Sequence, residues 1–154
     1  MPNLFEPLTI KGLALKNRVV MPPMACECGT LEGFVTAQNI DYYVKRAKGG
    51  VGTIIVEHNF ISPLGRYRKR QLSIMSDEYI DGLSKIVEAV KKYGCTVGLQ
   101  ISHAGSRAQE ALIGEQPAAP SAVMHPKGTD MPREMSKAEI GQVVADFISA
   151  SRRA

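Results

Sequence analysis

The sequence predicts an α/β fold built on a parallel β-sheet, and three observations support this prediction. Three short, mostly apolar runs, 18–21, 53–56 and 96–101, have the residue content of buried strands. An amphipathic helical pattern follows each run. Each run also ends in residues that can bind a ligand or take part in chemistry. In a parallel α/β fold such strand ends lie on one side of the sheet, where ligands bind.

The segment before the first strand predicts a β-hairpin. Leu8–Ile10 and Leu13–Leu15 are short apolar runs on either side of Lys11-Gly12, and a glycine-bearing turn is typical of a tight hairpin. The first strand, Arg18–Met21, ends at Pro22-Pro23 because proline has no N–H to donate to a strand ladder. We therefore expect a hairpin followed by three βα units with right-handed crossovers.

The first two helices are predicted from apolar residues at helical spacing and from their caps. Thr36 is the expected N-cap of the first helix, which stops at Gly49-Gly50. Ser76 is the expected N-cap of the second helix, which stops near Gly94.

The last helix is predicted to begin at a capping box and to bury one apolar face. A long loop, from about Gly105 to Met135, precedes it. Ser136 and Glu139 have the spacing of a capping box. The expected buried face consists of Ile140, Val143, Val144, Phe147 and Ile148.

Size, charge and cysteine content limit the class of protein. The chain has 154 residues, 44% of them hydrophobic, and a net charge of +4, which does not by itself imply nucleic acid. Its basic run, Arg66–Arg70, is interpreted as a solvated loop or as a contact for an anionic cofactor tail or substrate phosphate. Three cysteines fit a reducing cytoplasm, the segment Met1–Glu6 does not resemble a signal peptide, and no apolar stretch approaches a membrane span of about 20 residues. We expect a cytoplasmic protein without membrane or nucleic-acid partners.

The C-terminus interrupts the βα pattern. Arg152-Arg153-Ala154 lies on the last helix, with no glycine cap and no following strand. Three parallel strands alone would leave two exposed sheet edges. We expect the rest of a larger fold, a partner chain or a second copy of this chain to cover them.

Motifs along nearly the whole chain resemble one family in their order and spacing. They are Leu4–Leu8, Leu15–Met21, Pro23-Met24, Tyr43–Gly52, Pro63–Arg66, Ser76–Glu78, Gly98–Gly105, Ala119–Ala122 and Ala150–Ala154. The set resembles the Old Yellow Enzyme family, also called NADH:flavin oxidoreductases.

The resemblance implies a (β/α)8 TIM barrel that binds FMN non-covalently above its C-terminal face. A complete barrel takes about 250 residues, so the hairpin and about three βα units would form its N-terminal portion. Residues 1–154 are expected to be an incomplete FMN-binding TIM-barrel domain. The implied activity is that of an FMN-dependent NAD(P)H oxidoreductase of the ene-reductase type. Hydride would pass from NAD(P)H through flavin N5 to the activated C=C bond of a small enone or enoate.

The resemblance also implies five cofactor-binding residues. The backbone of Pro23, Met24 and Ala25 would lie against the flavin near N5 and O4, although without the resemblance this stretch could simply end a strand. Many relatives have Thr or Cys at the position of Ala25, and alanine cannot bond flavin O4 through its side chain. Gln100 would bond the flavin pyrimidine edge through its amide, or else satisfy a loop backbone. His58 would contact the flavin or support residues that do.

Other residues of the family's site are missing from this chain. The substrate-anchoring His-His or His-Asn pair, the tyrosine proton donor and the basic residues for the FMN phosphate would come after Ala154. We therefore expect no catalytic residue and no metal ligand here, and we expect the chain alone to be inactive. His103 would border the cofactor or bond loop backbone.

Two alternatives come from other function classes. Cys26, Cys28, His58 and His103 stand at or after strand ends, as ligands do in metal-dependent barrel hydrolases. The exposed sheet edges could instead belong to a non-catalytic half-barrel that binds a partner chain. Visible absorbance, metal analysis and gel filtration distinguish these alternatives from a flavoprotein.

Overall fold

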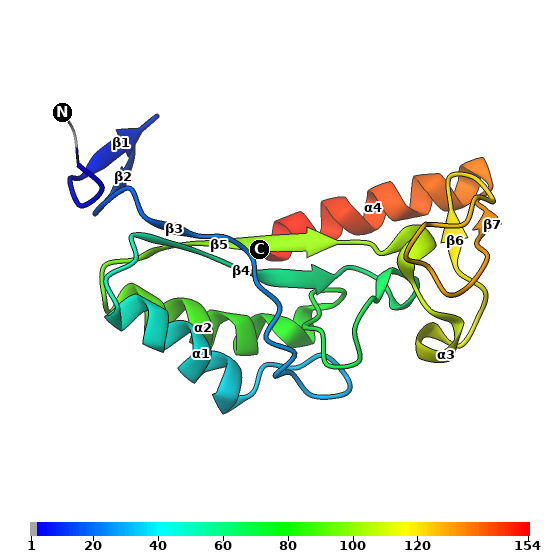
Figure 1. Ribbon diagram of the computed structural model, residues 1–154, viewed down its shortest axis with the longest axis horizontal. Coiled ribbons are helices and arrows are strands. Elements are labelled where there is room, and N and C mark those ends of the chain that lie inside the picture. The colour runs from blue at the N-terminus through cyan, green and yellow to red at the C-terminus, as the bar shows by residue number, and fades with distance from the viewer. Residues whose placement is uncertain (1–2) are drawn as a thin grey trace.

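The centre of the molecule is a three-stranded parallel sheet. The computed structural model describes residues 3–154; Met1 and Pro2, which begin the segment compared above with signal peptides, lie outside the described residues. The sheet has the order β3 (Val20–Met21), β4 (Thr53–Phe60) and β5 (Thr96–Ser102), with both pairs parallel (Figure 1). The predicted parallel α/β architecture is confirmed.

The predicted hairpin is present and stands apart from the sheet. Strands β1 (Leu8–Ile10) and β2 (Leu13–Leu15) pair antiparallel around Lys11 and Gly12. These two turn residues have φ angles of 45° and 86°, as a type I′ turn requires. Figure 1 shows the hairpin beyond the N-terminal end of the sheet.

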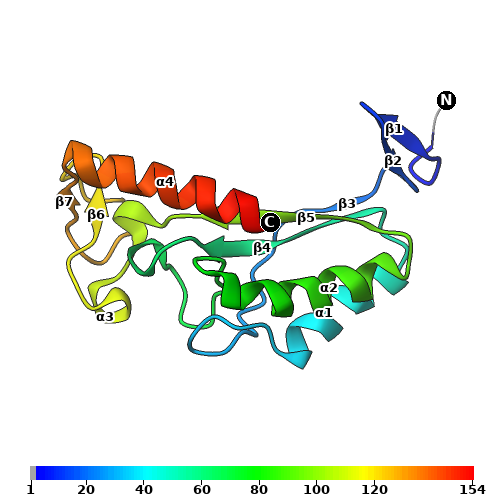
Figure 2. The ribbon, with the colours of Figure 1, turned by 180° about the vertical axis from the view of Figure 1, so that it is seen from behind.

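Helices α1 (Ala37–Lys48) and α2 (Ile80–Lys91) pack on one face of the sheet (Figures 1 and 2). Thr36 caps α1 as predicted, in a capping box with Asn39. Ser76 does not cap α2, because its hydroxyl donates to Glu78 and a 3₁₀ turn, Asp77–Tyr79, precedes the helix. The core between helices and sheet is apolar and fully enclosed, and includes Tyr43, Ile54, Val56, Leu72, Ile74, Ile86 and Val90.

Two strand boundaries differ from prediction. Strand β3 is shorter, because the N–H of Arg18 donates to Leu4 instead of joining the sheet. Strand β4 is longer and does not end at Val56, since a bulge between Val56 and Asn59 lets it continue to Phe60. A bulge inserts an extra residue and re-aims side chains, so polar residues can lie inside this strand.

The predicted long loop contains short ordered elements. These are a 3₁₀ turn (Gly105–Arg107), α3 (Glu110–Ile113), β6 (Ala118–Ala119) and β7 (Arg133–Glu134), the last two paired in parallel. A further 3₁₀ turn, Pro63–Gly65, follows β4. Two-residue strands carry too little pattern to be predicted from sequence.

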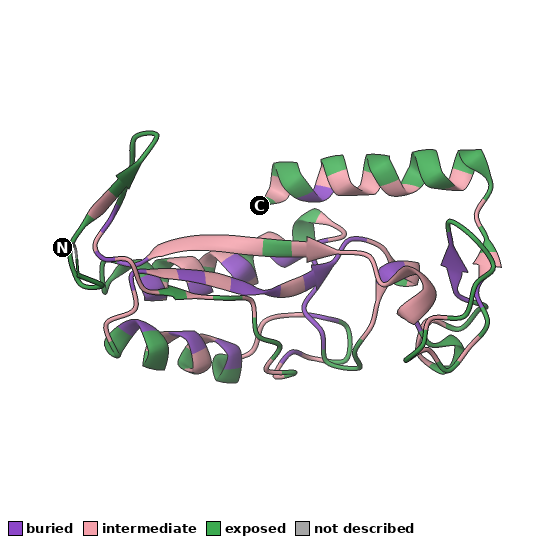
Figure 3. Ribbon diagram, turned by 45° about the horizontal axis from the view of Figure 1, so that its top comes forward, coloured by how far each residue is buried: buried purple, intermediate pink, exposed green. Residues whose placement is uncertain are grey.

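Helix α4 (Lys137–Arg153) runs along β5, and its predicted buried face is mostly uncovered (Figure 3). The Ser136–Glu139 capping box is confirmed. Ile140, Val144 and Ile148, however, are 43%, 53% and 50% exposed, because no element among residues 3–154 packs on that side. Within the same described residues, no helix is long and apolar enough to cross a membrane.

Candidate functional site

Gln100 lies on the face of the sheet that α1 and α2 do not cover. On β5, Val97, Leu99 and Ile101 pack against the core. Since side chains alternate along a strand, Gln100 and Ser102 point to the opposite face. The Gln100 side chain is exposed, and none of residues 3–154 forms a hydrogen bond with its amide. Its carboxamide is therefore free to bind a ligand at the C-terminal end of β5.

The loop after β3 presents Pro23, Met24 and Ala25 at the same end of the sheet. Met24 is 54% exposed, Ala25 is exposed and Pro23 is half-buried. The loop is anchored one residue later, where the N–H of Cys26 donates to Glu57 Oε2 over 3.2 Å. The three predicted cofactor-binding residues are therefore held between strand β3 and the hydrogen bond from Cys26 to Glu57.

Glu57 is the centre of this anchor and only 1% exposed. Its Oε1 accepts from the Cys26 thiol at 3.0 Å and from the Tyr43 hydroxyl at 3.1 Å. The N–H of Glu57, left out of the ladder by the bulge, donates to the Tyr43 oxygen at 2.9 Å. Asn39 Nδ2 donates to Cys26 Sγ at 3.3 Å. These four residues, Asn39, Tyr43, Cys26 and Glu57, are called the Glu57 cluster below.

The Glu57 cluster keeps Cys26 protonated. Burial, followed by the hydrogen bond to Glu57, raises the pKa of the Cys26 thiol far above its ordinary value. Burial and the same carboxylate raise the pKa of the Tyr43 hydroxyl. A cysteine reacts as its thiolate, so Cys26 serves here as a neutral hydrogen-bond donor. Sequence reasoning missed this cluster, although a glutamate directly after an apolar strand was a usable signal.

His58 is half-buried at the end of β4 and is tied to a neighbouring loop. Its Nδ1 lies 3.2 Å from Gln71 Nε2, which also donates to Ser102 Oγ at 3.4 Å. Burial, and to a lesser degree the charges of Arg68 and Arg107, lowers the pKa of His58. His58 is therefore neutral at pH 7, and buried Gln71 joins it to β5.

His103 bonds loop backbone, one of the two roles that the sequence left open. Its Nδ1 accepts from the N–H of Gly105 at 3.1 Å. Its ring lies so close to Gly65 that a Cβ there would be 2.8 Å from His103 Cδ2. Burial lowers the pKa of this imidazole.

The residues proposed for a metal-dependent hydrolase do not form a ligand set. Cys26 is bonded to Glu57, His58 to Gln71 and His103 to Gly105. No group of three or more His, Cys, Asp or Glu side chains within 3–154 could hold a metal ion. The hydrolase alternative gains no geometric support from the described part of the chain.

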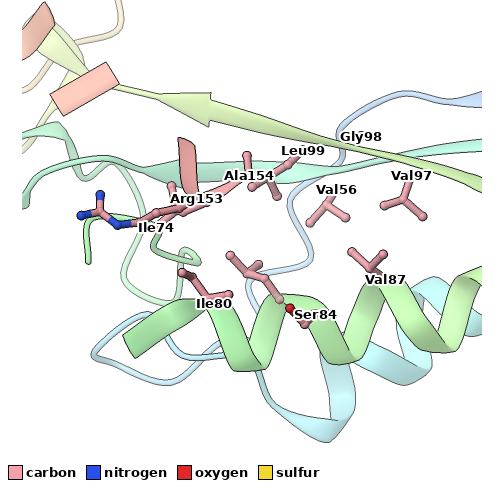
Figure 4. A pocket seen from close by; sticks show the side chains of 11 residues that line it. Val56, Ile74, Ile80, Ser84, Val87, Val97, Gly98, Leu99, Arg153 and Ala154 are labelled. Carbon is pink, nitrogen blue, oxygen red and sulfur yellow. The ribbon is translucent and has the colours of Figure 1, made fainter. Parts of the chain in front are cut away.

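An apolar hollow of about 130 Å³ lies on the other side of the sheet (Figure 4). In Figure 4, Val87 projects from α2 toward Val56 and Val97 on the strands, and Ile80 lies near Ile74 and Arg153. The hollow is a packing gap between the sheet, α2 and the end of α4. It lies away from the face of Gln100.

The comparisons with known proteins agree with this geometry. The chain matches the NADH:flavin oxidoreductase / NADH oxidase family over residues 3–154. It belongs to this family. It is 42% identical to the NADPH dehydrogenase of Bacillus subtilis over 154 residues, and 43% identical to the NADH:fumarate oxidoreductase of Klebsiella pneumoniae over 155. These matches cover 99% of this chain but 44% and 17% of the respective relatives.

A solved structure gives the same result for the fold. The Old Yellow Enzyme homologue from Zymomonas mobilis has a TM-score of 0.90 and 30% identity, over 99% of this chain and 45% of that one. The chain spans less than half the length of such relatives and has the fold of the N-terminal part of their TIM barrel. The resemblance to the Old Yellow Enzyme family is confirmed.

Membership of the NADH:flavin oxidoreductase family assigns FMN as the cofactor. The residues present fit FMN. A flavin pyrimidine edge offers both a donor and acceptors, and the free carboxamide of Gln100 can satisfy both. Met24 and Ala25 are exposed at the same end of the sheet.

Proposed function

We propose that residues 1–154 form the incomplete, FMN-binding N-terminal part of an NAD(P)H-dependent ene-reductase. The observation that carries this proposal is the free Gln100 carboxamide at the strand ends, beside a loop anchored by a buried carboxylate. FMN, when bound, supplies hydride transfer from NAD(P)H to an activated C=C bond of an enone or enoate.

Each of the five predicted cofactor-binding residues has a defined part in this proposal. Gln100 holds the pyrimidine edge, and the backbone of Pro23, Met24 and Ala25 lies along the N5 and O4 side. Backbone N–H groups held in place stabilise negative charge without reorganising. His58, neutral and fixed by Gln71, borders the same site. Substrate anchoring and protonation require residues beyond this chain, so the chain alone is expected to be colourless and inactive.

The test uses a barrel-completed protein, in which this chain replaces the matching segment of the Bacillus subtilis NADPH dehydrogenase. We expect it to purify with bound flavin and to oxidise NAD(P)H in the presence of 2-cyclohexenone. Replacing Gln100 by Leu removes both a donor and acceptors, and should weaken FMN binding by about tenfold or more. Flavin absorbance after gel filtration and a fluorescence titration with FMN measure this change.

The matched control is Gln38→Leu, an exposed glutamine on α1. It should leave FMN affinity unchanged. Equal flavin content in the Gln100→Leu and Gln38→Leu proteins would remove Gln100 from the site. A completed protein that folds without flavin would contradict the proposed function.

A second candidate, a half-barrel that binds a partner chain, is favoured by the apolar side of α4. Ile140, Val144 and Ile148 are exposed along one helix face, and exposed apolar patches mark interaction surfaces. Gel filtration of the 154-residue chain separates the candidates, since a stable monomer would count against a partner-binding half-barrel.

A further inference from the structure

Two arginines share one tyrosine ring beside the strand ends. The guanidinium carbons of Arg68 and Arg107 lie 4.7 and 4.5 Å from the ring centroid of Tyr67. Arg107 also donates to the Tyr67 hydroxyl at 2.5 Å. An aromatic face attracts a cation, so the ring brings together two charges that would otherwise repel. These three residues are called the Tyr67 cluster below.

The positive charge of the Tyr67 cluster is largely uncompensated. Arg68 pairs with Glu27 at 3.5 Å, but both side chains are nearly half exposed, and such pairs are weak. Arg107 has no carboxylate partner within residues 3–154, and its buried Nε has no hydrogen-bond partner there. The charge of Arg107 is therefore not balanced by an ion pair among the described residues.

Gln71 fixes the Tyr67 cluster against the candidate flavin site. Its Oε1 accepts from the N–H groups of Tyr67 and Arg68 at 2.8 and 3.1 Å. Its Nε2 bonds His58 and Ser102 at the ends of β4 and β5. The rings of Tyr67 and His58 are 6.2 Å apart. The cationic groups are therefore attached to the same strand ends as Gln100.

Two members of the cluster, Tyr67 and Arg68, line an open hollow, and Arg107 is held against the same tyrosine ring. A space of about 400 Å³ is lined by Tyr67, Arg68, Lys69, Glu27 and Gln109 among others. It is large enough for a small carboxylate or a phosphate group with part of the molecule that carries it.

We propose that Arg68 and Arg107, stacked on Tyr67, bind the anionic group of a substrate of this enzyme. The inference rests on the proposed function and deepens it. Guanidinium groups bind carboxylate and phosphate oxygens through paired N–H donors. The anion is either a carboxylate on the unsaturated acceptor or the additional phosphate of NADPH. In both cases the cluster selects a charged ligand over its neutral or less charged analogue.

The test measures KM in the barrel-completed protein for two matched pairs of substrates. The acceptor pair is 3-oxocyclohexene-1-carboxylate and its methyl ester, which carry the same activated C=C bond. The reductant pair is NADPH and NADH. Arg107→Gln should raise KM by about tenfold for either the carboxylate or NADPH, because one charge-assisted hydrogen bond is lost. KM for the matching ester or for NADH should stay within about twofold. Arg107→Lys should lose less, because it keeps the charge.

The matched control is Arg46→Gln, since Arg46 also stacks on a tyrosine, Tyr42, at 3.6 Å, but on helix α1. It should change none of the four KM values. A selective effect on the carboxylate or on NADPH identifies the source of the anion. Unchanged values, or equal losses for both members of each pair, would overturn the inference.

Calorimetric titration measures anion binding independently of reductase activity, so failure of the anion site can be distinguished from failure of the proposed function. The carboxylate acceptor and NADPH are titrated into the unsubstituted and Arg107→Gln proteins, with or without flavin. If the completed protein has no reductase activity, the proposed function fails, yet Arg107-dependent binding would still support the anion site. If neither ligand binds more weakly to the Arg107→Gln protein, the anion site is refuted, whatever the activity.

Discussion

The Glu57 cluster and the Tyr67 cluster meet at the same strand ends but differ in burial and charge. Glu57 is 1% exposed, and its carboxylate accepts three hydrogen bonds from Cys26 and Tyr43. The Tyr67 cluster is cationic, and its Tyr67 and Arg68 side chains line an open hollow. A satisfied buried group holds the backbone in place, whereas a cationic group beside an open hollow is available to an anionic ligand. The first cluster is therefore suited to positioning and the second to recognition.

The largest effect on stability is expected when the Glu57 carboxylate is removed. Glu57→Ala leaves the Cys26 N–H, the Cys26 thiol and the Tyr43 hydroxyl without their acceptor. We expect a loss of about 3–5 kcal/mol in the free energy of unfolding, measured by urea denaturation of the barrel-completed protein. Glu57→Gln keeps one acceptor oxygen and should lose less. A loss below about 1 kcal/mol for Glu57→Ala would end the positioning interpretation.

A smaller effect is expected for Tyr43→Phe. The ring stays in the core, but the Glu57 N–H at the bulge loses its acceptor and the carboxylate loses a donor. We expect a loss of about 1–3 kcal/mol in the free energy of unfolding. The control is Tyr42→Phe, on the adjacent, less buried position. Equal stability of the two variants would show that the buried hydroxyl contributes nothing measurable.

The smallest effect on stability is expected in the Tyr67 cluster. Arg107→Gln should change the free energy of unfolding by less than about 0.5 kcal/mol at pH 7, although it should weaken anion binding. The same substitution should raise the pKa of His58, because the Arg107 charge is one of the causes that lower it. Proton NMR titration of the His58 ring measures this shift. A His58 pKa that stays the same would mean that Arg107 is too far away to affect this site.

The pH dependence of stability follows from the same histidine. The pKa of His58 in the folded protein lies below its ordinary value of about 6.5, chiefly through burial. The unfolded chain therefore binds the proton more readily than the folded protein. The contribution of neutral His58 to folding stability is complete above about pH 6.5 and is lost as the pH falls through the pKa of the folded protein. Because His103 has a pKa shifted in the same direction, the residue-specific NMR titration is needed to assign the change.

Much of the fold follows from local sequence signals. The turn at Lys11-Gly12 and the caps at Thr36 and Ser136 are decided by neighbouring residues, and all three predictions are confirmed. The end of β4 was predicted wrongly, because Glu57 and His58 look like loop residues until Tyr43 on α1 and Gln71 in the following loop provide their partners. The face of α4 was predicted to be buried, since periodicity shows which side is apolar but not what covers it.

By itself, the sequence determined the parallel α/β order, the caps at Thr36 and Ser136, and the family motifs that point to FMN. Those features depend on residue type and spacing along the chain. Only the tertiary structure brought Cys26, Tyr43 and Glu57 into one hydrogen-bonded group, and Tyr67, Arg68 and Arg107 into one cationic group. Both groups join residues from separate segments, and their burial and charge balance depend on three-dimensional contacts that spacing does not encode.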